Sequence, residues 1–271
     1  MAAPPKVTID DLSGKFVMNR NLSDPIDPIL TLQGLSWFLR KAISFATVTL
    51  SVHQYRKPAS EEPKQPIHID ITQRATGGIS TTQENRVLDW SERDHEDRIF
   101  GKVKGKSRMF EGFGGGENGF KMEGKGGEVD ERFLKGDVDK DGKTESEKAA
   151  GTEAEGAEGD KTTQQEGEGT TSTATAATTS GWLDENSARH VQSWVVNVDE
   201  TAAGGWTAEQ VWGFEMFDQK RYYTRRVVVR KGEDKVERAR LVYDYKGEVD
   251  MEAEKAEDGK KAAAEELEVE Y

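Results

Sequence analysis

The feature that most restricts the fold is a long series of segments in which apolar and polar residues alternate, with almost no helical pattern between them. Val48, Leu50 and Val52 alternate with threonine and serine, and three isoleucines alternate with polar residues between positions 67 and 72. A period of two is typical of β-strands, because successive side chains point to opposite faces. We expect ten strands, at 12–20, 47–52, 67–72, 79–88, near Asp89-Trp90, 98–110, 190–198, 207–217, 221–230 and 235–245.

One stretch between the first two strands has a helical period instead. Leu32, Leu35 and Leu39 recur at helical spacing, and Gly34 divides the stretch because glycine is a weak helix former. Trp37 and Phe38 lie off this stripe, so they must face something other than water. We expect a helix-turn-helix lid at 28–46, formed by residues that include Leu35, Trp37 and Phe38. Such a lid either caps the sheet, or moves to admit a ligand or to contact a membrane surface transiently.

The segment 79–88 indicates how the strands are arranged. A β-sandwich needs one apolar face on each strand, but both faces of 79–88 mix isoleucine, valine or leucine with threonine, glutamine, glutamate, asparagine and arginine. A barrel around a partly wet cavity tolerates such a strand, because water and ligand satisfy its polar groups. The predicted fold is all-β: a ten-stranded antiparallel up-and-down β-barrel with the helical lid between strands one and two.

Two acidic stretches lie outside this pattern. Residues 139–180 contain no large apolar residue and ten acidic against four basic side chains, and the tail at 247–271 has ten acids and three lysines. Their net charges of −6 and −7 equal the whole formal charge of −13, so the rest of the chain is neutral. Without apolar burial, such segments are expected to be disordered. We predict a flexible N-terminus at 1–11, barrel at 12–110, a disordered acidic insert at 111–185, barrel at 186–246 and an acidic tail at 247–271.

Composition excludes several classes of function. A neutral body lacks the excess of Lys and Arg that nucleic-acid binding needs, and zero cysteine excludes disulfides and thiolate metal sites. The four histidines have no metal-binding spacing. The N-terminus has no signal-peptide pattern and no apolar run is long enough to span a bilayer. We expect a cytoplasmic monomer without metal or cofactor.

The element order resembles that of the intracellular lipid-binding proteins, the fatty-acid- and retinoid-binding branch of the calycins. Leu12-Ser-Gly-Lys-Phe16 is similar to the opening strand of that family, and Gln33 to Ala42 followed by Thr47 to Val52 is similar to its lid and second strand. His190 to Trp194 and Arg240 to Tyr245 resemble its later strands. The pattern also resembles that of uncharacterised fungal proteins, some of which lie near genes of secondary metabolism. The resemblance implies a barrel that carries a hydrophobic ligand.

The resemblance also implies an anion site. Fatty-acid binders of the family hold a carboxylate with an Arg-x-Tyr pair on the last strand, whereas this chain has Arg240 and Tyr243 one residue further apart. On a flat strand these two side chains face opposite sides. Either a bulge brings them together, or the cation comes from the preceding strand, where Tyr222, Thr224 and Arg226 share a face.

Other candidates for the cavity wall lie on neighbouring strands. Aromatic side chains that line a cavity bind apolar ligands by burial and stacking, although core packing explains them equally well. His190 and Gln192 share a face with Trp194, which makes His190 the best candidate for a polar group in the cavity. The full set of predicted ligand-binding residues is Trp194, Trp212, Gln210, His190, Gln192, Tyr222, Thr224, Arg226, Arg240 and Tyr243.

Three hypotheses for function follow. The first is a non-catalytic carrier of a hydrophobic small molecule, such as a lipid or a polyketide-like metabolite. The second is an isomerase or cyclase of secondary metabolism that uses the same cavity, with His190, Tyr222 or Arg226 steering the reaction. The third is an interaction scaffold that works through its acidic segments.

Overall fold

A computed structural model describes residues 1–76, 80–97, 99–114, 116–147, 181–183, 189–199 and 205–249. It contains the ten predicted strands with small shifts of their ends. The short strand expected near Asp89-Trp90 begins later, at Arg93, because Trp90 adopts a φ of 60° in the preceding turn. The strands are β1 Gly14–Met18, β2 Val48–Arg56, β3 Ile67–Ala75, β4 Ser80–Val87, β5 Arg93–Asp97, β6 Gly101–Glu111, β7 Arg189–Asn197, β8 Trp206–Phe217, β9 Lys220–Lys231 and β10 Lys235–Gly247.

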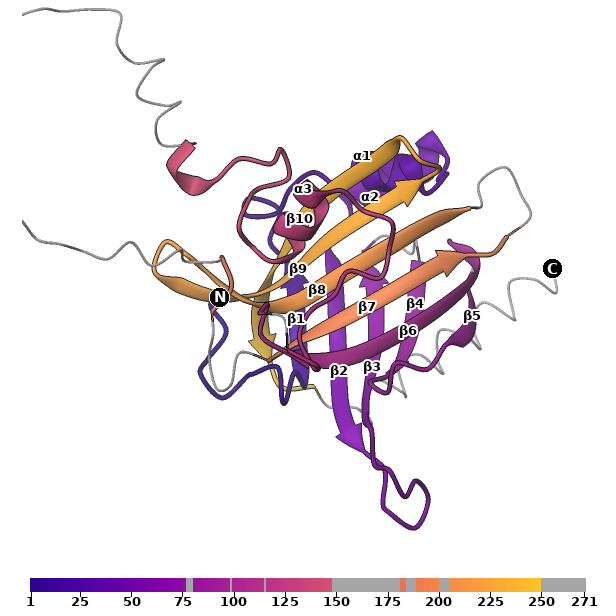
Figure 1. The fold of residues 1–271 in the computed structure, drawn as a ribbon, viewed down its shortest axis with the longest axis vertical. Helices are drawn as coiled ribbons and strands as arrows, with labels where there is room; N and C mark the ends of the chain where they lie inside the picture. The colour runs from indigo at the N-terminus through magenta and orange to yellow at the C-terminus, as the bar shows by residue number, and fades with distance from the viewer. Residues whose placement is uncertain are drawn as a thin grey trace, which may run out of the picture.

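All ten strands form one antiparallel sheet in the order β4-β3-β2-β1-β10-β9-β8-β7-β6-β5. The first strand pairs with both β2 and β10, so the two ends of the barrel sequence meet. The sheet curls until its two edge strands approach, and β2 to β4 cross behind β6 to β10 (Figure 1). We call the gap between the edge strands β4 and β5 the seam. The predicted all-β barrel architecture is confirmed.

The inner face of the sheet is solid at one end. Phe16, Leu50, Ile69 and Trp212 are completely or almost completely buried there, together with Tyr223. The N-terminal residues, for which we expected flexibility, belong to the same cluster: Ala3, Val7 and Ile9 are buried. They are apolar enough to add to the core, and the Ala3 amide donates to the Arg221 carbonyl at 2.7 Å.

Two helices cover the other end. They are α1 Asp27–Leu32 and α2 Trp37–Phe45, separated by Gly34 with a φ of 85°. Ser36 begins α2 by accepting a hydrogen bond from the Leu39 amide at 3.3 Å, which satisfies a free N–H of the first turn. Together the helices form the predicted lid.

The lid differs from prediction in the residues that face the barrel. Leu35 is buried between the helices in a cluster with Leu30 and Ile43. Trp37 and Phe38 are 65% and 78% exposed, so they do not cover the barrel mouth. The reason is geometric: the helical stripe that contains Ile43 turns inward, and the residues at the start of α2 then project outward.

The structure also differs from prediction over part of the supposed acidic insert. Within 111–185 it shows a helix, α3 Glu128–Leu134, on the outer face of β9. We call residues 112–114 and 116–138 the outer strap. Phe120, Phe133, Leu134 and Val138 of this strap pack with strand residues to form a separate buried cluster. The apolar residues end at Val138, and the acidic residues 148–180 lie outside the described part of the chain.

The helices in the part of the chain that the structure describes are short. None of them is long and apolar enough to cross a bilayer.

Candidate functional site

The inner face of the sheet is hollow between the lid and the solid end. The cavity has a volume of about 210 Å³ and is bordered by α1 and α2. Its upper wall is apolar, because Ile29 and Leu30 of α1 and Ile43 of α2 meet apolar residues of the strands. The strand residues of this wall are Met18, Val48, Val103, Val195, Trp206, Ala208, Val227, Val229 and Leu241.

The floor of the cavity is polar and charged. Arg225 of β9 is only 4% exposed and donates from Nε to the Tyr223 hydroxyl at 2.9 Å. Its guanidinium lies 4.0 Å from the ring centre of Trp212, which is a favourable cation–π distance. Trp212 in turn donates from Nε1 to Gln210 Oε1 at 2.9 Å. Four polar or aromatic side chains from β8 and β9 therefore form a connected floor.

Two tyrosines beside Arg225 remain protonated at neutral pH. Burial raises the pKa of Tyr243 to about 12, and burial also raises the pKa of Tyr223. A protonated phenol is both a donor and an acceptor of hydrogen bonds. Tyr243 belongs to the cavity wall, so its hydroxyl is available to the polar end of a ligand.

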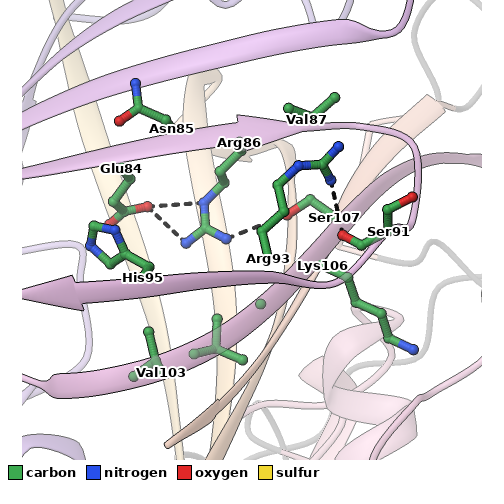
Figure 2. A pocket seen from close by; sticks show the side chains of 12 residues that line it. Glu84, Asn85, Arg86, Val87, Ser91, Arg93, His95, Val103, Lys106 and Ser107 are labelled. Carbon is green, nitrogen blue, oxygen red and sulfur yellow. Dashed lines mark hydrogen bonds and ion pairs between the residues drawn. The ribbon is translucent and has the colours of Figure 1, made fainter.

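A second charged pair lies at the seam. Glu84 accepts hydrogen bonds from Arg86 Nε at 3.0 Å and Nη2 at 2.8 Å. Arg86 then crosses from β4 to β7 and β6, where it donates to Ser193 Oγ at 2.6 Å and Ser107 Oγ at 3.3 Å. Figure 2 shows this pair beside His95 in a smaller pocket of about 70 Å³. Because Glu84, Arg86 and His95 line both spaces, the pocket at the seam lies directly beside the main cavity.

The charge balance of the floor is positive. Burial opposes the ionisation of Glu84, but the charges of Arg86 and Arg225 outweigh it and lower the pKa of this carboxyl. Glu84 is therefore a carboxylate at neutral pH. Two guanidinium groups face one carboxylate, which leaves one uncompensated positive charge at the closed end of the cavity.

Three of the predicted ligand-binding residues lie on the inner face. Gln210 and Tyr243 line the cavity, and Trp212 lies beneath Arg225 in the floor. The other seven lie on the outer face, because Ser193, Val195 and Arg225 occupy the inward positions of β7 and β9. These seven are His190, Gln192, Trp194, Tyr222, Thr224, Arg226 and Arg240.

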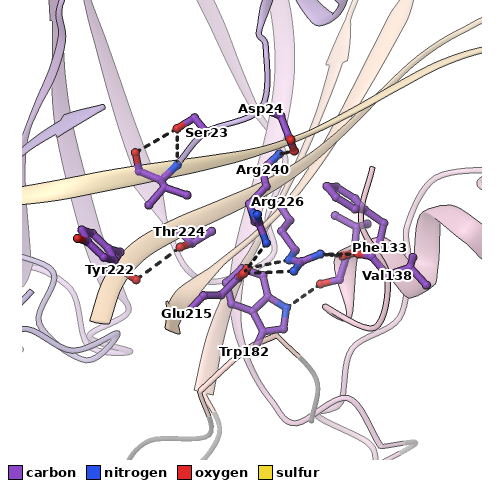
Figure 3. Close-up of polar contacts among 12 residues, drawn as sticks. Ser23, Asp24, Phe133, Val138, Trp182, Glu215, Tyr222, Thr224, Arg226 and Arg240 are labelled. Atoms are coloured by element: carbon purple, nitrogen blue, oxygen red, sulfur yellow. Dashed lines mark hydrogen bonds and ion pairs between the residues drawn. The ribbon is translucent and has the colours of Figure 1, made fainter. Parts of the chain in front are cut away.

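The outward residues contact the chain itself. Arg226 forms a buried pair with Glu215, with distances of 2.8 Å and 3.2 Å from Nε and Nη2 to the two carboxylate oxygens. Its Nη1 donates to the Phe133 and Val138 carbonyls of the outer strap, at 3.0 Å and 2.8 Å (Figure 3). Trp182 closes the same region by donating to the Leu134 carbonyl at 2.9 Å. Arg226 thus holds the outer strap and does not reach the cavity.

The outer face of β7 is used in the same way. Gln192 donates to Glu209 Oε1 at 2.6 Å and to the Lys121 carbonyl at 2.8 Å. Glu209 also accepts from the Glu123 and Gly124 amides of the strap. His190 stacks on Phe110 with ring centres 5.4 Å apart, inside the cluster beneath the strap. His190 and Gln192 are therefore not groups of the cavity.

The register of the last two strands bears on the two residue arrangements that the sequence suggested for an anion site. Arg240 pairs with Arg226 and Tyr243 with Tyr223 in an unbroken ladder, so no bulge brings Arg240 and Tyr243 to one face. The preceding strand does place an arginine on the cavity wall, but it is Arg225, the neighbour of the predicted Arg226. Arg225, Glu84 and Arg86 were not predicted from the sequence, although Glu84 and Arg86 share one face of a strand that is unsuited to a dry core.

Comparison with known proteins gives distant relatives. The chain is 24% identical over 249 residues to the pericyclase pydY of Acremonium sp., which covers 91% of this chain and 98% of that protein. It is 23% identical over 246 residues to the probable pericyclase scpY of Mollisia scopiformis, which covers 91% of this chain and 95% of that protein. No family model matches the chain.

Two solved structures have some likeness to the chain. The fluorescent protein UnaG is 11% identical with a TM-score of 0.38, over 86% of this chain and 96% of that one. A fatty acid-binding protein from brain tissue of Drosophila melanogaster is 12% identical with a TM-score of 0.37, over 85% of this chain and 95% of that one.

Proposed function

We propose that the protein binds one hydrophobic small molecule in its inner cavity and catalyses a pericyclic ring closure within it. The observation that carries this proposal is the cavity itself: a hollow of about 210 Å³ with an apolar wall at the lid and a cationic floor. Two relatives named as pericyclase and probable pericyclase, matched over nearly their whole length, support the catalytic part.

The chemistry of the cavity suits such a reaction. A pericyclic reaction reorganises bonds in one cyclic step, so it needs neither a nucleophile nor a proton acceptor. What a protein can supply is a folded conformer of a flexible substrate, with reacting atoms held about 3–3.5 Å apart. The apolar wall of the cavity, which includes Ile29 and Val229, would hold the unsaturated chain in that conformer by burying it.

The floor adds an electrostatic contribution. Hydrogen-bond donors fixed at a carbonyl withdraw electrons from a double bond conjugated with it, which accelerates ring closure at that bond. Such donors act most strongly where water is excluded. Arg225 and the neutral Tyr243 are donors of this kind, held in place by the packed end of the barrel.

A direct assay tests the proposal. Linear trienes that carry a conjugated carbonyl are incubated with the protein, and ring closure and diastereomer ratio are followed by chromatography. We expect a faster reaction and one favoured diastereomer. The variant Ala208→Trp fills the upper cavity and should abolish both effects, whereas Lys104→Ala, on the exposed side of β6, should change neither.

The carrier hypothesis uses the same cavity and is separated by the same assay. Stoichiometric binding of the trienes without acceleration would favour a carrier. No binding at all would contradict both functions. The scaffold hypothesis depends mainly on acidic residues outside the described part of the chain and stays a prediction.

A further inference from the structure

The pocket at the seam, which we call the side pocket, lies against a strand residue that has no side chain. Gly105 of β6 is paired with Arg93 of β5 and with Val195 of β7. Residues paired directly across strands point to the same face, and Val195 lines the main cavity. A side chain at position 105 would therefore project into the barrel. The side pocket of about 70 Å³ is lined by both Gly105 and Val195.

Neither the backbone nor the packing requires glycine at this position. Gly105 does not have a positive φ, and an added Cβ atom would meet the Trp194 carbonyl oxygen and Val195 Cγ2 at ordinary distances of 3.5 Å. Both ladders of β6 continue past Gly105 without a register shift, so it does not mark a bulge. Glycine inside a strand is unfavourable relative to alanine, and close approach of a ligand is one known reason for it. What the missing side chain provides here is space.

This space adjoins the main cavity. A volume of about 70 Å³ is several times what a single water molecule needs. Two of the residues that line both spaces, Val103 and Val195, are apolar, and they flank Gly105. A molecule that fills the main cavity can therefore place a short branch against Gly105.

The charges around the side pocket are already matched. The lysine and the two arginines that line it each form an ion pair with a carboxylate. The pairs are Arg86 with Glu84, Arg93 with Asp89, and Lys106 with Glu123. Arg86 also donates to Ser107 Oγ (Figure 2). A charged branch would have to displace one of these pairs, whereas an uncharged branch gains contact with the two valines without doing so.

We infer that the side pocket receives a short uncharged branch of the substrate, and that Gly105 selects the branched substrate by leaving room for it. This inference rests on the proposed function and makes its substrate class more specific. The conformer in which a chain closes into a ring decides which diastereomer forms. A branch held in the side pocket restricts the bound chain to one conformer, so Gly105 determines the stereochemistry of the product as well as the choice of substrate.

The first test measures binding. A series of saturated, unreactive analogues of the trienes carries one ethyl branch at successive carbons, and each is compared with the unbranched parent by quenching of tryptophan fluorescence. We expect at least one branched analogue to bind at least about tenfold more tightly than the parent, because each buried methylene contributes about fourfold. If the parent binds and no branched analogue binds more tightly, the inference is overturned and the proposed function stands. If no analogue binds, the proposed function fails.

Two variants fill the side pocket in steps. Gly105→Ala should reduce the preference for the branch by about fourfold, the contribution of one buried carbon, and Gly105→Leu should abolish it. Affinity for the unbranched parent should be almost unchanged in both, which also reports that the main cavity is intact. Gly114→Leu in the outer strap, where an added Cβ would have no neighbour within 4 Å, is the matched control and should keep the full preference. Equal loss of affinity for branched and unbranched analogues would overturn the inference.

Stability and stereochemistry complete the test. If Gly105 serves the ligand and not the fold, Gly105→Ala should have a Tm no lower than that of the wild type, because alanine is more favourable than glycine inside a strand. A clear fall in Tm would show a structural role and overturn the inference. With the branched triene, Gly105→Leu should lose the diastereomer preference of the wild type. Accelerated ring closure with an unchanged diastereomer ratio in this variant would overturn the inference and leave the proposed function intact.

Discussion

Removing the buried pair of Arg226 and Glu215 tests whether stability and ligand binding depend on opposite faces of the sheet. Both side chains are 3% exposed, and the guanidinium donates four hydrogen bonds, two of them to the outer strap. Arg226→Met leaves a buried carboxylate and two strap carbonyls without this partner. Breaking a buried pair in this way typically costs about 3–5 kcal/mol. Arg240, 3.5 Å from Glu215, partly compensates the carboxylate, so we expect about 3 kcal/mol.

The assay is thermal and urea unfolding followed by tryptophan fluorescence. For a domain of this size, 3 kcal/mol corresponds to a fall in Tm of about 6–12 °C. The double variant Arg226→Met, Glu215→Leu removes the stranded charge and should recover about 1–2 kcal/mol, which a double-mutant cycle detects. Binding of the trienes, measured well below Tm, should not change, because Arg226 lies outside the cavity. A loss of stability below about 1 kcal/mol, or a loss of triene binding in the folded variant, would refute the reasoning.

Three further results are expected. Because the folded-state pKa of Glu84 lies below its ordinary value of 4.5, its stabilisation is complete above that pH and is lost as the pH falls through the folded value; Glu84→Gln should be less stable at neutral pH and show a flatter urea midpoint between pH 5 and 3. Gly213→Ala would place a methyl group 2.9 Å from Trp182, so it should destabilise the protein by about 1–3 kcal/mol and increase amide exchange in the outer strap. Hydrogen bonding to Arg93 lowers the pKa of Asp89 to about 2, and NMR titration of Arg93→Gln should show it returning toward 3.8.

Much of the fold was predictable because the local pattern and the final environment agree. β2 and β3 bury alternate residues such as Leu50 and Ile71, and the sequence shows that alternation directly. β4 was recognised as unsuited to a dry core, and the structure places its charged Glu84 and Arg86 on the cavity and the seam. In these strands the order of apolar and polar residues in the sequence shows which side chains point inward.

The site was less predictable because β9 is buried on both faces. Residues 221–229 are all buried, since the cavity lies on one side and the outer strap on the other. Alternation of polar and apolar residues then gives no inward direction, and Arg225 and Arg226 are equally plausible from sequence. The few large apolar residues of the strap, such as Phe120 and Phe133, were the available sign that the outer face would be covered. The many glycine and glutamate residues around them favoured the prediction of a disordered insert instead.

The seam has a mechanical consequence for the enclosure. Nine pairings hold the sheet together through backbone ladders. Between β4 and β5, in the part of the chain that the structure describes, the circumference is completed by side chains instead, chiefly Arg86 on Ser193 and Ser107. Widening there breaks a few side-chain bonds and leaves every ladder in register. The ring is therefore adjustable at one line along its length, and under the proposed function this would let ligands of different width bind above the same packed aromatic end.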